Sequence, residues 1–153
     1  MPPRGRAKTC TTADHVRTFV DTNVLVYLFD AGQPAKQQTA REIVAGLARA
    51  GTLVVSSQVL NEFYVTVTRK LQEPLPVSTA LRALADFTAY PCVAIDAALV
   101  QRAAVRSAGD QLSHWDALIV EAAIESGAEV LCSEDFTAGQ VYQGVRVEDP
   151  FAG

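Results

Sequence analysis

Four acidic residues stand where the local pattern could place a carboxylate for chemistry. They are Asp21, Glu62, Asp116 and Asp135. Carboxylates gathered at one site repel each other, and a divalent cation relieves that repulsion. All-oxygen ligands suit Mg²⁺ or Mn²⁺, and two such ions can activate a water and stabilise a leaving oxygen in phosphodiester hydrolysis. Such chemistry requires a fold that brings the four side chains together.

Asp21 directly follows Thr18–Val20, a segment suited to a buried strand, and directly precedes the apolar run Val24–Phe29. This order predicts a strand that ends in an acid, with a helix starting at once. Ligands of open α/β sheets bind outside the carboxyl ends of the strands, so Asp21 is placed for chemistry. The same position also suits a helix N-cap, for which Asp is a favoured residue.

Asp116, like Asp21, could serve either chemistry or helix capping. Ser113-x-x-Asp116 has capping-box spacing, and an acid in a first turn suits the helix dipole. On a helical wheel, however, His114, Glu121 and Glu125 group together as the predicted solvent face, and Asp116 lies opposite to them. A carboxylate that faces the interior or a cleft needs a partner or a metal, because burying it unpaired is costly. The wheel therefore favours function over capping.

Glu62 and Asp135 are less sharply defined. Glu62 faces away from the apolar stripe of its helix, which fits either a solvated face or a cleft wall, and periodicity favours the solvated face. Asp135 follows a predicted strand and should project over the same sheet edge as Asp21, although it could be an ordinary loop acid or a cap. Its neighbour Glu134 is a competing candidate. Ser133 could hydrogen-bond a carboxylate or a metal-bound water.

Strand and helix patterns alternate along the chain, which predicts an α/β fold with a mainly parallel sheet covered by helices. Strands are expected over 17–21, 52–56, 91–95, 129–132 and 145–147. Helices are expected over 22–29, 35–50, 57–72, 78–88, 97–108 and 113–126. Glycines at 51, 109 and 127 suit helix ends.

Length and composition indicate one globular domain, expected over 17–151. Residues 1–16 read as a disordered basic leader without the apolar segment of a signal peptide. No apolar run approaches the roughly 20 residues of a membrane span. The net charge is −4. The leader carries Arg4, Arg6 and Lys8 against Asp14, a net +2, so the folded part carries −6 and needs a local basic patch or bound cations to bind nucleic acid.

The cysteines and histidines offer no competing site. The three cysteines, Cys10, Cys92 and Cys132, form no CxxC motif, and the last two lie in predicted strands as small buried hydrophobes. This usage favours a reduced, cytoplasmic protein without a thiolate metal site. Two isolated histidines are too few for a His-based site. The P-loop, GxGxxG, HExxH and GxSxG motifs are all absent.

The motifs around the four acids resemble those of PIN domains. The segment Phe19-Val20-Asp21-Thr22-Asn23 resembles the opening PIN motif. Asn61-Glu62, Ser113-His114-Trp115-Asp116-Ala117-Leu118-Ile119 and Ser133-Glu134-Asp135-Phe136 match the later acidic motifs in order and spacing. The ending from Gly144 to Phe151 resembles the tail of VapC-type toxins. The resemblance runs from about Arg17 to Phe151.

This resemblance implies a three-layer sandwich with a central, mainly parallel sheet of four to five strands. It implies a Mg²⁺- or Mn²⁺-dependent endoribonuclease, usually a homodimer, that acts on RNA and is often silenced by a small antitoxin. Asp21 and Asp116 would then be the principal metal ligands. Glu62 would bind metal or position water, Asp135 would complete the quartet, and Asn23 and Ser133 would orient that shell. Many relatives have a His before the glycine of the last motif, whereas this chain has Phe136-Thr137-Ala138-Gly139-Gln140.

Two other hypotheses stay open on the sequence. One is a PIN-fold protein that binds RNA or a partner without cutting; the other is a structural α/β domain whose acids are caps and surface charges. Cations that could line an RNA path are Lys36, Arg41, Arg69 and Lys70, although each is more simply read as solvated helix charge. The apolar positions Leu25, Leu28 and Phe29 could serve a dimer or an antitoxin helix, with core burial as the default.

Overall fold

The computed structural model describes residues 16–153. The expected leader therefore lies outside the described residues, apart from Val16, and its disorder stays a prediction. So does the domain boundary at 17–151. Within the described part, strands and helices alternate as the sequence predicts.

The sheet has six strands in the order β3-β2-β1-β4-β6-β5. Their bounds are β1 Thr18–Val20, β2 Leu53–Ser56, β3 Cys92–Val93, β4 Val130–Cys132, β5 Val141–Tyr142 and β6 Val145–Glu148. All neighbouring strands pair in parallel except β5 and β6, which are antiparallel. The central strands β1, β2 and β4 are buried throughout, as strands covered on both faces should be.

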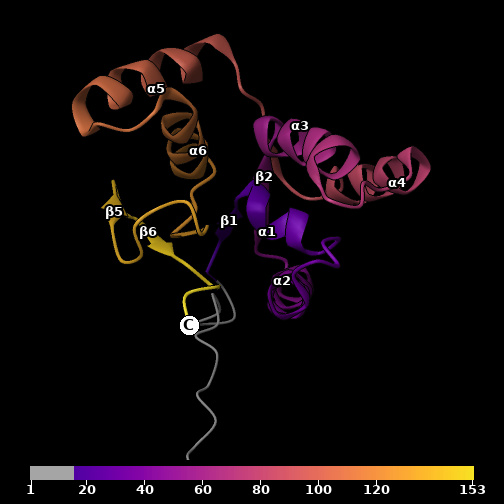
Figure 1. Ribbon diagram of the computed structural model, residues 1–153. Coiled ribbons are helices and arrows are strands. Elements are labelled where there is room, and N and C mark those ends of the chain that lie inside the picture. Colours follow the sequence, from indigo (N-terminus) through magenta and orange to yellow (C-terminus); the bar gives the residue numbers. More distant parts are fainter. Residues whose placement is uncertain (1–15) are drawn as a thin grey trace, which may run out of the picture.

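Helices cover both faces of the sheet. Their bounds are α1 Thr22–Tyr27, α2 Pro34–Ala50, α3 Ser57–Val65, α4 Val77–Phe87, α5 Ala97–Asp110 and α6 His114–Glu125. Figure 1 shows α1 to α4 on one side of β1 and β2, with α5 and α6 on the other side. The architecture is the predicted three-layer α/β fold with a mainly parallel sheet.

The sixth strand is the one addition to the predicted sheet. The sequence predicts no strand between 132 and 145, but Val141 and Tyr142 pair with Arg146 and Val145. The turn between them has positive φ at Gln143 (48°) and Gly144 (88°), as a tight two-residue hairpin turn requires. Two residues are too short for the alternating pattern that marks a strand in sequence.

The helix predicted over 57–72 changes type part-way. Its first part is α3, and Thr66–Lys70 form a π-helix, η1. The backbone N–H of Leu71 donates to the Thr66 carbonyl over 3.2 Å, a contact that spans five residues. Such π segments are rare and frequently occur at functional sites.

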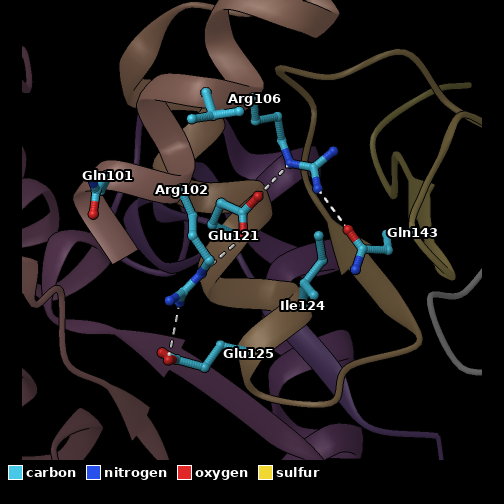
Figure 2. A pocket seen from close by; sticks show the side chains of 8 residues that line it. Gln101, Arg102, Arg106, Glu121, Ile124, Glu125 and Gln143 are labelled. Atoms are coloured by element: carbon cyan, nitrogen blue, oxygen red, sulfur yellow. Dashed lines mark hydrogen bonds and ion pairs between the residues drawn. The ribbon is translucent and has the colours of Figure 1, made fainter. Parts of the chain in front are cut away.

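The predicted solvent face of α6 is wrong at one position. Glu121 is only 6% exposed, because α5 packs against α6 and covers it. Arg106 donates to Glu121 over 2.6 Å and Arg102 lies 3.6 Å from it, as Figure 2 shows. The wheel identifies a polar face, but it does not reveal that a second helix supplies arginines to pair with it.

The predicted burial of the cysteines is right for Cys132 and wrong for Cys92. Cys132 is fully buried in β4, whereas Cys92 is exposed. The difference follows from sheet position, since β4 is central and β3 is a two-residue edge strand.

The three apolar residues considered for a dimer or antitoxin interface pack into the core. Leu25 is fully buried, and Leu28 and Phe29 are partly buried against the core. The Phe29 and Phe63 rings lie 5.7 Å apart. Core burial is thus the outcome at all three positions. Among residues 16–153, no helix is both long and apolar enough to span a membrane.

Candidate active site

Parallel pairing brings the candidate residues to one edge of the sheet. Val20 pairs with Cys132 in register, so Asp21 and Ser133 leave neighbouring strands side by side. The β2 strand points the same way, and α3, which carries Glu62, begins directly after it. Helix α6, which carries Asp116, packs against β4.

Asp21 is a buried carboxylate, 4% exposed. Its Oδ1 accepts a 2.7 Å hydrogen bond from the Thr22 backbone N–H, and its Oδ2 accepts one of 2.7 Å from the Ser133 hydroxyl. Burial raises the pKa of Asp21 to about 7; the two hydrogen bonds lower it, and the charges of Asp135 and Glu62 add to the rise. Asp21 also forms the N-cap of α1, which confirms the capping reading, and its chemical role stays a prediction.

Ser133 and Asn23 connect Asp21 to Asp135. The Asn23 side-chain amide donates to the Ser133 hydroxyl at 3.2 Å and to Asp135 Oδ2 at 3.1 Å. The backbone N–H of Asp135 also donates to the Ser133 hydroxyl, at 3.1 Å. The fully buried Ser133 therefore fixes one acid directly and the backbone of the other.

Glu62 points towards this cluster rather than into open solvent. The Thr22 hydroxyl donates to Glu62 Oε2 at 2.9 Å, and the Gln58 amide donates to Oε1 at 3.0 Å. The same Gln58 amide donates to the Trp115 carbonyl at 3.2 Å, which ties α3 to the first turn of α6. Of the two readings that the periodicity allows, the structure supports the cleft wall.

Asp116 is half-buried in the first turn of α6, where the Ser113 hydroxyl accepts its backbone N–H at 3.1 Å. Burial raises the pKa of the Asp116 carboxyl; Ser113 opposes the rise, and the charges of Asp135 and Glu62 add to it. The same two acids act on Asp21. The structure thus brings all four predicted acids into one electrostatic group.

Glu134, the competing candidate, is engaged elsewhere. Lys36 forms a 2.9 Å ion pair with its carboxylate, and the Tyr27 hydroxyl also donates to it. The Lys36 ammonium lies 4.9 Å from the centre of the Tyr27 ring. Glu134 is held in this α1–α2 contact, which leaves Asp135 as the acid that faces Asn23 and the cleft.

The cluster opens into a cleft of about 580 Å³, whose lining includes Thr22, Asn23, Glu62 and Asp135. The polar side chains of this wall present mainly oxygen atoms, and that set of ligand atoms suits a hard divalent cation. The Gln58 side-chain oxygen is buried without a hydrogen-bond donor, so the group has an oxygen that a bound water or cation could satisfy. Within residues 16–153, no three His, Cys, Asp or Glu side chains are arranged closely enough to hold a metal ion as they stand.

Sequence comparison places the chain in a known family. The PIN-domain family model matches residues 18–142, which is most of the chain. The protein belongs to the PIN-domain family. No curated protein sequence matches it.

Solved structures similar to this PIN domain are toxins of toxin–antitoxin systems. Mycobacterium tuberculosis VapC20, described as a sarcin-ricin loop cleaving toxin, has 24% identity and a TM-score of 0.58, covering 74% of this chain and 86% of that one. A toxin–antitoxin complex from Klebsiella pneumoniae has 18% identity and a TM-score of 0.65, covering 88% and 98%. VapBC2 from Rickettsia felis, bound to a promoter DNA fragment, has 18% identity and a TM-score of 0.56, covering 86% and 96%. At these identities the likeness establishes the shared fold.

Two parts of this PIN domain's site were not identified from the sequence. Gln58 lies on the polar face of its helix, and only the structure shows that it bridges Glu62 and the Trp115 carbonyl. The sequence also does not reveal that Tyr27 and Lys36 contact Glu134. A Gln four residues before a Glu is a common helical pair, and nothing local indicates that a distant helix will meet it.

Proposed function

We propose that this PIN domain is a Mg²⁺- or Mn²⁺-dependent endoribonuclease and the toxin of a toxin–antitoxin pair. The observation that carries the proposal is the gathering of the four acids at one edge of the sheet. Burial raises the pKa of both Asp21 and Asp116, and the charges of Asp135 and Glu62 add to both rises. Carboxylates gathered at one edge of the sheet repel each other, and a divalent ion offsets that repulsion.

Asp21, Asp116, Glu62 and Asp135 would hold the cation. When bound, Mg²⁺ or Mn²⁺ would supply activation of a water and stabilisation of the leaving oxygen. The other residues position these acids: Ser133 orients Asp21, and Asn23 orients Asp135. Thr22 and Gln58 hold Glu62 from two sides.

The substrate and partners are inferred from the relatives. VapC20 is described as cleaving the sarcin-ricin loop, which favours RNA as the substrate class here. The Klebsiella and Rickettsia structures are toxin–antitoxin complexes, which favours a small antitoxin as a partner. A homodimer and a cytoplasmic location remain part of the proposal.

The test is cleavage of a panel of labelled RNAs by chelator-stripped protein, with and without Mg²⁺ or Mn²⁺. Asp21→Asn and Asp116→Asn, purified identically, control for contaminating nuclease. Metal-dependent cutting by the wild type and by neither variant supports the proposal. If both variants cut RNA as fast as the wild type does, the proposal is wrong.

Calorimetric titration with Mn²⁺ separates the nuclease from a PIN-fold protein that binds RNA or a partner without cutting. A protein with an intact metal site binds Mn²⁺, and Asp116→Asn weakens that binding. A protein that binds no Mn²⁺ and cuts no RNA would instead fit the non-cleaving alternative.

A further inference from the structure

Among the described residues that line the cleft beside the acids, one has a cationic side chain. Its carboxylates are Asp30, Glu62 and Asp135, and its one cationic side chain is that of Lys70. A polyanion entering this cleft meets mostly negative charge. Lys70 is therefore the residue there that can attract a phosphate.

The π-helix explains why Lys70 reaches this wall. Glu62, Thr66 and Lys70 are spaced four residues apart, and all three line the cleft. In an α-helix, with 3.6 residues per turn, residues at this spacing drift progressively around the axis. The wider turn of η1 (Thr66–Lys70) contains more residues, so it reduces that drift and keeps Lys70 on the face of Glu62.

The Lys70 ammonium is also available. Lys70 is exposed, and within residues 16–153 it takes part in none of the ion pairs or side-chain hydrogen bonds. Lys36, by contrast, is paired with Glu134. Arg69 is equally exposed on the same turn but does not line the cleft.

We propose that Lys70 binds a backbone phosphate of an RNA strand that runs along this cleft into the acidic group. The inference rests on the proposed function and assigns a substrate contact to that site. An ammonium on a flexible stem is a common phosphate ligand that acts as a point charge. Lys70 lies eight residues beyond Glu62, about two helical turns along α3 and η1, so the phosphate it holds lies away from the bond that is cut.

The test is the salt dependence of RNA binding, which needs no cleavage. A fluorescently labelled single-stranded RNA oligonucleotide is titrated by anisotropy in chelator, from about 50 to 200 mM salt. Each phosphate contact to a single strand contributes about 0.7 to the slope of log K against log salt. Lys70→Ala should lower the magnitude of the slope by about 0.7 and weaken binding about two- to fivefold at the lowest salt.

Two variants serve as matched controls. Arg69→Ala removes the same charge from the same turn and should keep the wild-type slope. Lys70→Arg keeps the charge and should also keep it. A purely structural role for Lys70 would change the thermal midpoint without changing the slope.

The possible failures are distinguishable. If Lys70→Ala keeps the wild-type slope, or if the wild type does not bind the oligonucleotide, the phosphate contact is wrong even when metal-dependent cleavage is found. If the slope depends on Lys70 but no metal-dependent cleavage occurs, the contact stands and the nuclease proposal is wrong.

Discussion

The Ser133 hydroxyl donates a 2.7 Å hydrogen bond to the Asp21 carboxylate, although the two residues are 112 positions apart in sequence. The contact follows from strand register, because each residue directly follows one member of the Val20–Cys132 pair. Both side chains are buried, at 4% and 0% exposure. A buried carboxylate with two donors is held in one orientation, which is what an acid that must meet a cation requires.

Replacing Ser133 should change the ionisation of Asp21. Ser133→Ala removes a donor that lowers the pKa of Asp21, so that pKa should rise further above about 7. The measurement is a carboxyl NMR titration of the metal-free protein, with Asp21→Asn to assign the signal. Ser133→Thr keeps a hydroxyl and should titrate closer to the wild type. An unchanged titration in Ser133→Ala would mean that the hydrogen bond does not govern this carboxyl.

The ionisation of Asp21 should make the metal-free protein less stable as pH rises. Its folded-state pKa, about 7, is above the ordinary value of 3.8, so the folded state binds more protons than the unfolded state between these values. The free energy of unfolding should then fall as pH rises from about 4 to about 7, by at most about 4 kcal/mol from this residue.

Urea unfolding at pH 5 and pH 8, in chelator, measures this effect. Asp21→Asn should lack the part of the pH dependence that Asp21 contributes. Mg²⁺ should recover stability at pH 8 in the wild type more than in the variant, because it binds the ionised folded state. Parallel pH dependence in both proteins would contradict the prediction.

The neighbours Glu134 and Asp135 should differ in function. Asp135→Asn removes an acid of the cleft and should reduce metal-dependent cleavage at least about 10- to 100-fold. Glu134→Gln leaves the cleft acids intact and loosens the contact with Lys36, so it should affect stability more than cleavage. The two variants are compared by initial cleavage rates at saturating metal. If both variants lose the same cleavage rate, the predicted difference in role between Asp135 and Glu134 is wrong.

The α5–α6 ion pair should contribute to stability and leave RNA chemistry alone. Glu121→Gln removes one of the partners of Arg106, which keeps Asp110 and Gln143, and should cost about 1.5–3 kcal/mol in the free energy of unfolding. Glu125→Gln, on the same helix, breaks the more exposed pair with Arg102 and should cost less than about 1 kcal/mol. Chemical denaturation of the three proteins checks the order. Equal costs would indicate that burial of Glu121 does not matter.

The sequence by itself determined the fold class and singled out the four acids as candidates. Alternating apolar segments fix which strands are buried, and the polar residues that directly follow β1 and β4 must share a sheet edge once those strands pair in parallel. Local patterns also gave helix ends such as Gly51, with its positive φ of 69°. The predicted end at Gly109 is wrong, because α5 continues to Asp110 and Gln111 takes the left-handed conformation. These features depend on neighbours in the chain, so a local pattern carries them.

Only the tertiary structure decided which face each polar residue meets. Periodicity alone left Glu62 undecided, and contacts from Thr22 and Gln58 placed it in the cleft. The wheel put Glu121 in solvent, and arginines from α5 buried it. Lys70 lines the cleft together with Glu62 and Thr66, and the π-helix at Thr66–Lys70 that helps to keep it on that face has no mark in the sequence. Each face of a helix meets either solvent or another element, and the residues that contact it come from segments far away in the chain. The local sequence of the helix therefore does not identify them.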